Sequence, residues 1–475
     1  MRAFLLQKNG SMKIKITTHH TQMLSDTLTP VSIYLRVRDR FAGSILLESS
    51  DYHGHENSFS YICCGPMASF QLSDGKISTR LPGQEEVSEP AGKNVIERLN
   101  DFKNTFQTQQ HSFPFIQSGL FGYTAYDAVR YFEEIAIDVS GSEIPDMMYQ
   151  FFRYVIVVDH FKNQMYVFEH LLEGEESGLD AFVSQLRFGS NPLYTFNITD
   201  KEISNYTDEE FMDIVDKCIA HCNRGDVFQI VPSRRFVNSF KGDEFNVYRA
   251  LRSVNPSPYL FYFDYGSFKI FGSSPEAQIV IKNNEASIHP IAGTFRRTGD
   301  DEADRKLADR LMKDEKENAE HVMLVDLARN DLSINSEYVT VETFKEVQYY
   351  SHVIHLVSKV TGKLKEGVSP LQLVADTFPA GTLSGAPKHN AMKLINQYEN
   401  TSRSYYGGAI GFLGFNDDFN HAIMIRSFLS INNQLIYQAG AGVVSKSSPE
   451  SELKEVNNKL MALRSAMEEA EKIKS

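Results

Sequence analysis

The sequence predicts an α+β fold, because β-hairpin patterns and helical patterns occupy separate stretches of the chain. β-rich runs joined by short polar turns occur at 152–170, 276–291 and 421–442. Strands that are joined by tight turns must pair antiparallel. Patterns of helical period occupy other stretches, at 302–330, 386–399 and 449–471. Strand runs with segregated helices are typical of α+β proteins and not of a doubly wound parallel sheet.

The chain divides at one weakly patterned segment. Its 475 residues correspond to about three domain-sized units, or to fewer and larger ones. Met12 follows the letters KNGS, and we expect residues 1–11 to be an extension outside the fold. The segment 188–205 is the expected linker. It separates an N-terminal region, 12–187, from a C-terminal region, 206–470.

The composition is that of a soluble globular protein and excludes several classes of function. Hydrophobic residues make up 42% of the chain and charged residues 23%. The net charge of −13 argues against broad binding of nucleic acid or of an anionic membrane, which requires a basic face. The four cysteines form no CxxC pair, and no stretch is long and apolar enough to span a membrane. We therefore expect a cytoplasmic protein.

One candidate site lies in the stretch KENAEHVMLVDLARNDLS, residues 316–333. Val322, Leu324 and Leu327 fit a buried helix, and Glu320 enters at its start. A buried carboxylate is costly unless it is paired or bound to a metal. Taken alone, the pattern is more typical of a helix with one apolar face and one solvated acidic face.

A second acidic helix is predicted in SPESELKEVNNKL, residues 448–460, where Ser448 and the following proline form a good helix start. The spacing places Glu452, Glu455 and Lys459 on one face. Surface ion pairs have the same spacing. Acids on two separate helices nevertheless favour a cation site, because Mg²⁺ needs only one or two protein carboxylates plus substrate oxygens.

Three further features are compatible with an anionic ligand. The stretch FPAGTLSGAPKH ends in a helix start, whose free N–H groups suit an anion. The small residues of QAGAGVV permit close approach to the backbone. Arg426 lies inside the apolar strand expected at IMIRS and must find an anion or a buried partner. His355 lies among apolar residues, as a core histidine or as an acid/base group.

The stretch ASIHPIAGTFRRTGDD, residues 286–301, begins as a strand and is expected to break into a turn at Gly293 and Thr294. Together with the preceding stretches it resembles the chorismate-utilising enzymes. The motifs that carry the resemblance are PIAGTFRR, EHVMLVDLARNDL, GTLSGAPK, YYGGAIGF, IMIRS, QAGAG and SELKEVNNK. They cover roughly 205–463, and the resemblance implies large antiparallel sheets packed as a sandwich with helices outside.

Two further stretches, GSILLESS and NPSPYLFYF, look like the tryptophan-sensing elements of anthranilate synthase component I. By residue type alone they are a strand end and a proline-rich turn. The resemblance implies that tryptophan acts as an inhibitor. Its expected contacts are Glu48, Ser49, Pro258, Tyr259 and Leu260.

The resemblance also implies a reaction. Ammonia adds at C2 of chorismate, the C4 hydroxyl leaves, and loss of pyruvate gives anthranilate. Mg²⁺ would be held by Glu320 and Glu455. Glu276 in GSSPE matches a general acid for the departing hydroxyl, His355 a histidine associated with pyruvate elimination, and Thr382 a threonine near the substrate. Chorismate contacts map onto Gly293, Thr294, Tyr406, Arg426, Gly440, Ala441, Gly442 and Lys459.

The source of nitrogen is expected to be external. Aminodeoxychorismate synthases typically carry lysine at the position of Ala292, and isochorismate and salicylate synthases at the position of Gln229. This chain has neither lysine. No cysteine lies in a nucleophile-elbow context such as GxCxG. A separate glutamine amidotransferase subunit is therefore implied, and with it a hetero-oligomer.

Two alternatives stay open at this point. One is component I of aminodeoxychorismate synthase, which Ala292 disfavours. The other is a catalytically idle tryptophan-sensing subunit, which Glu276, Glu320 and His355 disfavour. Many relatives read PIAGTRPRG, whereas here Phe295 follows the threonine, so the roles of Arg296 and Arg297 are not assigned.

Overall fold

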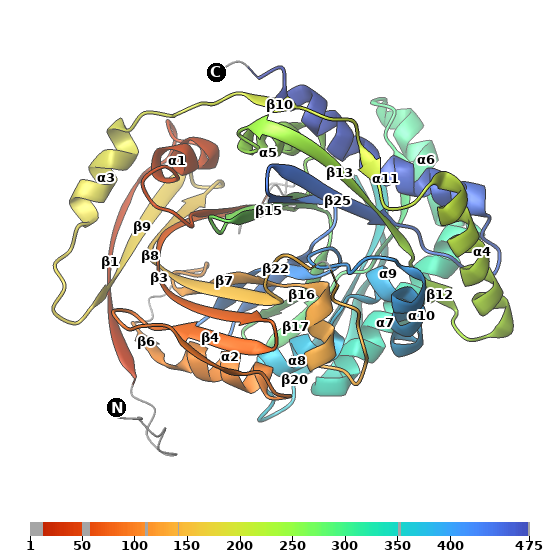
Figure 1. Ribbon diagram of the computed structural model, residues 1–475, viewed down its shortest axis with the longest axis horizontal. Helices are drawn as coiled ribbons and strands as arrows, with labels where there is room; N and C mark the ends of the chain where they lie inside the picture. The colour runs from red at the N-terminus through yellow and green to blue at the C-terminus, as the bar shows by residue number, and fades with distance from the viewer. Residues whose placement is uncertain (1–12, 50–57, 110–112, 141, 350–352, 474–475) are drawn as a thin grey trace.

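Antiparallel sheets form the centre of the molecule, and helices cover its outside (Figure 1). The structure is a computed structural model and describes residues 13–49, 58–109, 113–140, 142–349 and 353–473. The predicted extension at 1–11 lies outside the described residues. The predicted α+β sandwich with outer helices is confirmed.

Elements of the N-terminal part are β1 (Ile14–Leu24), α1 (Pro30–Val37), β2 (Ile45–Glu48), β3 (Phe59–Ser73), β4 (Lys76–Arg80), β5 (Val87–Pro90), α2 (Val95–Asn104), β6 (Phe106–Thr108), β7 (Gly119–Thr124), the 3-10 helix η1 (Tyr126–Tyr131), β8 (Met147–Asp159), β9 (Gln164–Leu172) and α3 (Leu179–Phe188). The middle part contains β10 (Phe196–Ile198), β11 (Ile203–Ser204), α4 (Asp208–Arg224), β12 (Gln229–Ile230), β13 (Ser233–Gly242), α5 (Phe245–Val254), β14 (Tyr259–Asp264), β15 (Phe268–Ser274), β16 (Ala277–Lys282), β17 (Glu285–Ile288) and β18 (Ile291–Arg296).

The C-terminal part contains α6 (Asp301–Lys313), α7 (Glu315–Asn335), β19 (Ser336–Tyr349), β20 (Val353–Leu364), α8 (Pro370–Thr377), α9 (Gly381–Ser384), β21 (Gly385–Ala386), α10 (Lys388–Tyr398), β22 (Ala409–Gly414), β23 (Phe419–Ile423), β24 (Ser427–Ile431), β25 (Gln434–Gly440) and α11 (Pro449–Ala470). The expected hairpins correspond to β8–β9, β16–β17 and β24–β25. Asparagine pairs at 283–284 and 432–433 turn the last two with positive φ, as tight hairpin turns require.

Two long strands, β3 and β8, join the layers of the sandwich. They pair with each other along most of their length, and β8 also pairs with β7 at one end and β9 at the other. From β3 the ladder continues through β2, β14, β15, β24, β25 and β13. From β7 it continues through β22, β23, β16, β17 and β20. A register shift between Pro66 and Ala68 bends β3, as strands that change sheets require.

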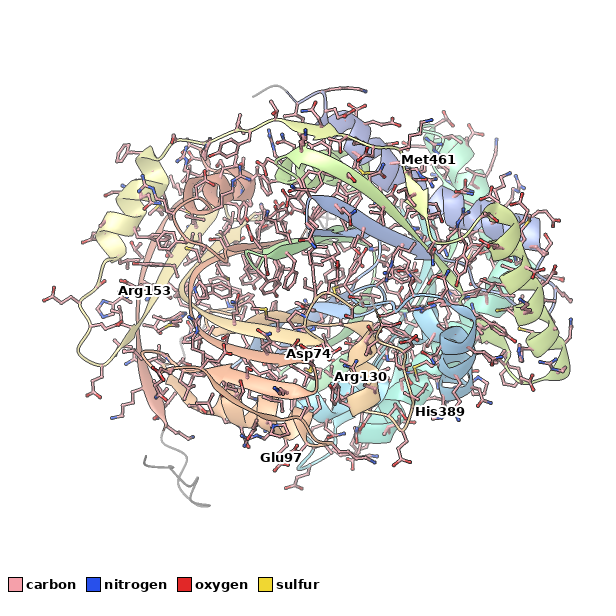
Figure 2. All side chains as sticks on the ribbon, in the orientation of Figure 1. Asp74, Glu97, Arg130, Arg153, His389 and Met461 are labelled. Atoms are coloured by element: carbon pink, nitrogen blue, oxygen red, sulfur yellow. The ribbon has the colours of Figure 1, made fainter. Side chains whose placement is uncertain are left out.

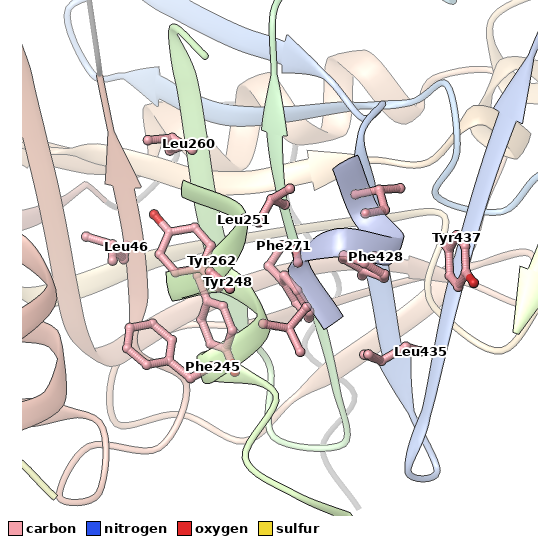
Figure 3. Close-up of a cluster of buried hydrophobic side chains, with 14 of the residues drawn as sticks. Leu46, Phe245, Tyr248, Leu251, Leu260, Tyr262, Phe271, Phe428, Leu435 and Tyr437 are labelled. Atoms are coloured by element: carbon pink, nitrogen blue, oxygen red, sulfur yellow. The ribbon is translucent and has the colours of Figure 1, made fainter. Parts of the chain in front are cut away.

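The largest core lies between the sheet and helices α5 and α11. Side chains fill the space between the layers (Figure 2), and aromatic rings from α5 meet rings from the sheet (Figure 3). Phe245 and Tyr248 of α5 lie 4.9 and 5.5 Å from Tyr262, measured between ring centroids. Val456 and Leu460 of α11 are fully buried in the same core. This packing fixes the helix that carries the predicted Glu455 and Lys459.

The helical pattern at 302–330 forms two helices. Asp314 separates α6 from α7 and caps α7, accepting a hydrogen bond from the Glu317 backbone at 3.0 Å. The expectation that Val322 is buried is wrong, since it is 40% exposed. His321 is buried instead and contacts Ser358 at 2.6 Å. The helical period puts one face inside, and that face begins one residue earlier than the apolar run indicates.

The expected division of the chain stays a prediction. Within the predicted linker, β10 and β11 both pair with β13. Two ladders, β2–β14 and β7–β22, connect the N-terminal and C-terminal regions. Across the described ranges, we find no helix with the length and apolar character needed to cross a bilayer.

Candidate active site

Strand β18 carries a bulge at Gly293, and the expected turn at this position is wrong. Ala292 pairs with Leu356 and Thr294 with His355, so Gly293 is the extra residue in the ladder with β20. Its φ of +72° favours glycine, and a Cβ there would lie 2.7 Å from a Leu311 methyl group. The strand continues to 296 because β20 supplies its partners. Of Thr294 only the backbone is described.

His355 lies beside this bulge. Its Nδ1 is 3.1 Å from the Gly293 carbonyl oxygen, a distance that assigns the proton to Nδ1 and leaves Nε2 as an acceptor. Burial lowers the pKa of His355, and the Arg426 charge adds to that effect, although the Gly293 carbonyl opposes it. The imidazole is therefore neutral near pH 7 and suited to accept a proton.

Glu276 precedes β16 and meets Thr382 from the short helix α9. The Thr382 hydroxyl donates to Glu276 Oε1 at 3.2 Å. Burial raises the pKa of Glu276 to about 7, while Thr382 and the Lys459 charge oppose the rise. Glu276 and Thr382 also line a cavity of about 30 Å³. A carboxyl group that keeps its proton near neutral pH can act as a general acid.

Two cations come from α11 and from the connection between β23 and β24. Lys459 Nζ is 2.6 Å from Glu455 and donates to the Gly440 carbonyl at 2.9 Å. Arg426 lies in the connection, with φ of +50°, so its expected place inside a strand is wrong. It donates to the Lys459 carbonyl at 3.1 Å. Burial lowers the pKa of Arg426, while Tyr406 and Glu455 oppose the fall.

The QAGAG segment completes the cationic side. Gly440 ends β25, and its backbone hydrogen-bonds the Tyr406 hydroxyl, whose pKa burial raises to about 12. Ala441 is fully buried and Gly442 is partly exposed. A Cβ on Gly442 would lie 2.5 Å from the Gln229 amide nitrogen, so Gln229 packs directly on this segment.

Glu320 of α7 and Glu455 of α11 lie close enough to interact through their charges. Burial raises the pKa of Glu320, and Glu317 and Glu455 raise it further. No group of three or more His, Cys, Asp or Glu residues forms a metal site within the described ranges. Mutually repelling carboxylates on two helices still fit Mg²⁺, because substrate oxygens complete its shell.

Sequence reasoning missed one member of this acidic cluster, Glu317, and placed a second, Glu452, on the acidic face without giving it a role. Glu317 adjoins Glu320 in space, and its own pKa is raised by burial, with Glu455 contributing. Glu452 is 5% exposed, and burial raises its pKa too. The i, i+3 spacing that relates Glu452 to Glu455 also relates Glu317 to Glu320, and this was the signal that could have identified Glu317.

The five residues expected to contact tryptophan line one larger cavity. They are Glu48, Ser49, Pro258, Tyr259 and Leu260, and the cavity measures about 300 Å³. Rings from Phe59, Tyr61, Phe115 and Phe412 form much of the remaining wall. Glu48 is already engaged, since Tyr248 donates to it at 2.6 Å and Arg252 at 3.0 Å.

One ladder links the larger cavity to the candidate active site. Tyr259 and Leu260 pair with Ser274 and Ser273 on β15. The Ser273 N–H donates to the Arg426 carbonyl at 3.0 Å. The Ser274 hydroxyl accepts from the Glu276 N–H at 3.4 Å. Strand β15 therefore connects the predicted tryptophan contacts on β14 with the predicted active-site residues Arg426 and Glu276.

Known proteins resemble the chain along nearly its whole length. The family model described as chorismate binding enzyme matches residues 44–465. Anthranilate synthase component 1 of Aquifex aeolicus is 37% identical over 474 residues, which cover 95% of this chain and 94% of the relative. The protein of that name from Thermus thermophilus is 35% identical, with 96% and 99% covered.

Solved structures agree with these relatives. Anthranilate synthase component I from Streptococcus pneumoniae superposes with a TM-score of 0.76 and 31% identity, covering 93% of this chain and 99% of that one. The menaquinone-specific isochorismate synthase of Escherichia coli superposes with a TM-score of 0.73 over 97% of each chain. Its identity of 18% shows a shared fold alone.

Proposed function

The chain belongs to the chorismate binding enzymes, and from that premise we propose that it is the large subunit of an anthranilate synthase. It would convert chorismate and ammonia to anthranilate and pyruvate, the first committed step of tryptophan biosynthesis. One observation carries the proposal: a buried Glu276, whose pKa is raised to about 7, shares a site with Arg426 and Lys459, while Ala292 and Gln229 supply no amine. The relatives named above support the same choice.

Glu276 is suited to the first difficult step. Hydroxide is a poor leaving group and needs a proton as the C–O bond breaks. With a pKa of about 7, Glu276 can deliver that proton to the C4 oxygen of chorismate, which then departs as water. Thr382 donates to Oε1 and so leaves Oε2 to carry the transferred proton.

His355 is suited to the second step. Loss of pyruvate from the aminated intermediate requires removal of the ring proton at C2. A neutral imidazole with Nδ1–H fixed on the Gly293 carbonyl presents Nε2 as the base.

Chorismate carries two carboxylates, and the site offers cations and backbone donors for them. Arg426, Lys459 and the Gly440–Gly442 backbone lie together on one side. Glu320 and Glu455 would hold Mg²⁺, which when bound supplies positive charge for the ring carboxylate. Burial, and after it the charges of Glu317 and Glu455, raise the pKa of Glu320. This supports the role, because a bound cation would stabilise the ionised carboxylates.

The nitrogen would come from a glutamine amidotransferase partner. A glutaminase needs a thiolate nucleophile, which requires a lowered pKa. Burial raises the pKa of all four cysteines here, namely Cys63, Cys64, Cys218 and Cys222. Ammonia would thus pass from a second subunit, and the working enzyme would be a hetero-oligomer.

The 300 Å³ cavity is the proposed tryptophan site. Its aromatic wall suits an indole, and Glu48 suits an ammonium group. Tryptophan bound there would reach Arg426 and Glu276 through the β14–β15 ladder. Feedback inhibition by the end product follows from this connection.

A product assay tests the proposal. The isolated chain with chorismate, Mg²⁺ and ammonium should form fluorescent anthranilate, and added tryptophan should inhibit. A non-aromatic aminated product would indicate an aminodeoxychorismate synthase instead. Tryptophan binding without turnover by the folded chain would indicate an idle sensing subunit.

A further inference from the structure

A buried ion pair lies behind the candidate active site, outside the groups that touch substrate. Arg403 and Glu399 have side chains that are 2% and 5% exposed. Arg403 Nε donates to one carboxylate oxygen at 2.8 Å and a terminal nitrogen to the other at 2.6 Å. Glu399 also accepts from the backbone and hydroxyl of Ser233, at 2.8 and 2.7 Å. Glu399 thus accepts four hydrogen bonds, two of them from Arg403 in a bidentate pair.

The position of Glu399 on α10 makes its carboxylate costly in free energy without Arg403. Glu399 caps the C-terminal end of the helix, where the helix dipole disfavours a negative charge. Burial of an unpaired carboxylate adds to that cost. A pair of this kind is weak evidence for stability alone, because an apolar replacement of similar volume is often neutral or better. The contacts that Arg403 makes beyond Glu399 indicate a second role.

Those contacts reach the segments that carry predicted active-site residues. Arg403 donates to the Leu383 carbonyl at 2.7 Å, within the helix α9 that carries Thr382. It also donates at 2.6 Å to the Val231 carbonyl, directly after β12. Its guanidinium lies 5.8 Å from the ring centroid of Tyr406. One side chain therefore contacts three segments: α9, which carries Thr382, the end of β12, and the segment of Tyr406.

We propose that Arg403, fixed by Glu399, is a positioning residue that holds Thr382 against Glu276 for proton transfer. The inference rests on the proposed function. The connection runs from the Arg403 bond to Leu383, through the adjacent Thr382, to its hydroxyl bond with Glu276 Oε1. Lysine cannot replace Arg403, because its single nitrogen lacks the planar fork that reaches Glu399, Leu383 and Val231 together.

The experiment compares Arg403→Lys with a matched control, Arg38→Lys. Arg38 is also buried, with a side chain 8% exposed, and makes a bidentate pair with Asp243 at 3.1 and 2.6 Å, outside the residues of the candidate site. Arg403→Lys should lower kcat for anthranilate formation about tenfold to a hundredfold, because small misplacements cost rates of that order. Arg38→Lys should lower the melting temperature and leave kcat within about twofold.

A double-mutant cycle separates positioning from mere support of the fold. Thr382→Val removes a hydrogen bond that lowers the pKa of Glu276, so the alkaline limb of kcat/KM should move to higher pH. Arg403→Lys should move it in the same direction, and the double variant no further. An unchanged limb in folded Arg403→Lys, or additive shifts, overturns the inference.

Two additions keep the outcome decisive. Should Arg403→Lys fail to fold, Ser233→Ala removes one hydroxyl bond to Glu399 and should give a smaller shift in the same direction. Titration of the Glu276 carboxyl by ¹³C NMR, assigned with Glu276→Gln, reports the same shift without turnover. A parent chain that makes no anthranilate overturns the proposed function, whereas an unshifted Glu276 titration in the folded variant overturns this inference.

Discussion

Buried carboxylates have opposite surroundings in the candidate active site and in the larger cavity of about 300 Å³. In the active site, burial raises the pKa of Glu276 and Glu320, and Glu320 lies beside other acids. In the cavity, Glu48 is already neutralised by Arg252 and bonded by Tyr248. Charge left uncompensated marks a place where a ligand, metal or proton transfer completes the balance. A carboxylate paired in advance can receive a ligand only by exchange.

The substitution with the largest expected effect on this difference is Glu276→Gln in the active site. The amide keeps the shape and the contact with Thr382 but cannot donate an acidic proton. Turnover should fall by about 10² to 10⁴-fold, the usual contribution of a general acid. Anthranilate fluorescence measures the loss, and calorimetry with chorismate should show binding largely retained. Glu285→Gln, at the exposed first residue of β17, is the control. Unchanged turnover in Glu276→Gln removes Glu276 from the mechanism.

The same substitution, which lowers turnover, should raise the stability of the folded protein at neutral and higher pH. The pKa of Glu276 rises from 4.5 to about 7 on folding. Below pH 4.5 the carboxyl is protonated in both states, and between pH 4.5 and 7 only the unfolded state ionises, so the parent loses stability as pH rises. Glu276→Gln should escape this loss, by up to about 3 kcal/mol at pH 8. Urea unfolding at pH 4 and pH 8 measures it, and parallel pH profiles for the two proteins would contradict the raised pKa.

Glu320→Gln tests whether the acidic cluster serves a cation. Removal of one charge should raise the Mg²⁺ concentration for half-maximal activity at least about tenfold. Asp326→Asn, on the exposed side of the same helix, should leave it unchanged. Equal Mg²⁺ dependence in the two variants would assign the cluster a structural role only.

Arg252→Gln tests the other half of the comparison, namely whether the Arg252–Glu48 pair in the cavity competes with a bound ligand. Without Arg252, Glu48 keeps the hydrogen bond from Tyr248 but loses the Arg252 charge, and a ligand ammonium group no longer competes with that cation. Tryptophan should inhibit at about fivefold lower concentration, the value of about 1 kcal/mol typical of a half-exposed ion pair. Arg249→Gln on the same helix is the control, and Ser49→Ala should act in the opposite direction. Weaker inhibition in Arg252→Gln would mean that Arg252 itself contacts the ligand.

Local patterns made much of the fold predictable. Asparagine pairs fixed two hairpin turns, and Ser448 caps α11 by accepting from the Ser451 N–H at 3.3 Å. The bulge at Gly293 was not predictable, because a bulge depends on the register of the partner strand β20. A glycine before a threonine reads equally well as a turn.

Long-range pairing limits what the sequence reveals about the sites. Motifs identified Glu48, but its partner Arg252 lies 204 residues along the chain. Arg403 reads as a loop residue in TSRSYYGG, and only the folded chain places it between Leu383 and Val231. The sequence therefore allowed us to predict roles that depend on a residue's own chemistry. It did not allow us to predict roles that depend on contacts with residues far away in the chain.

Strands β3 and β8 have a consequence for recombination between relatives. Each belongs to both layers, and the β2–β14 and β7–β22 ladders connect the regions on either side of 188–205. A chimera joined at that segment would have to match two ladders residue by residue, because a shift of one position turns every side chain to the opposite face. The two regions are therefore expected to be inherited together and to resist exchange as interchangeable modules.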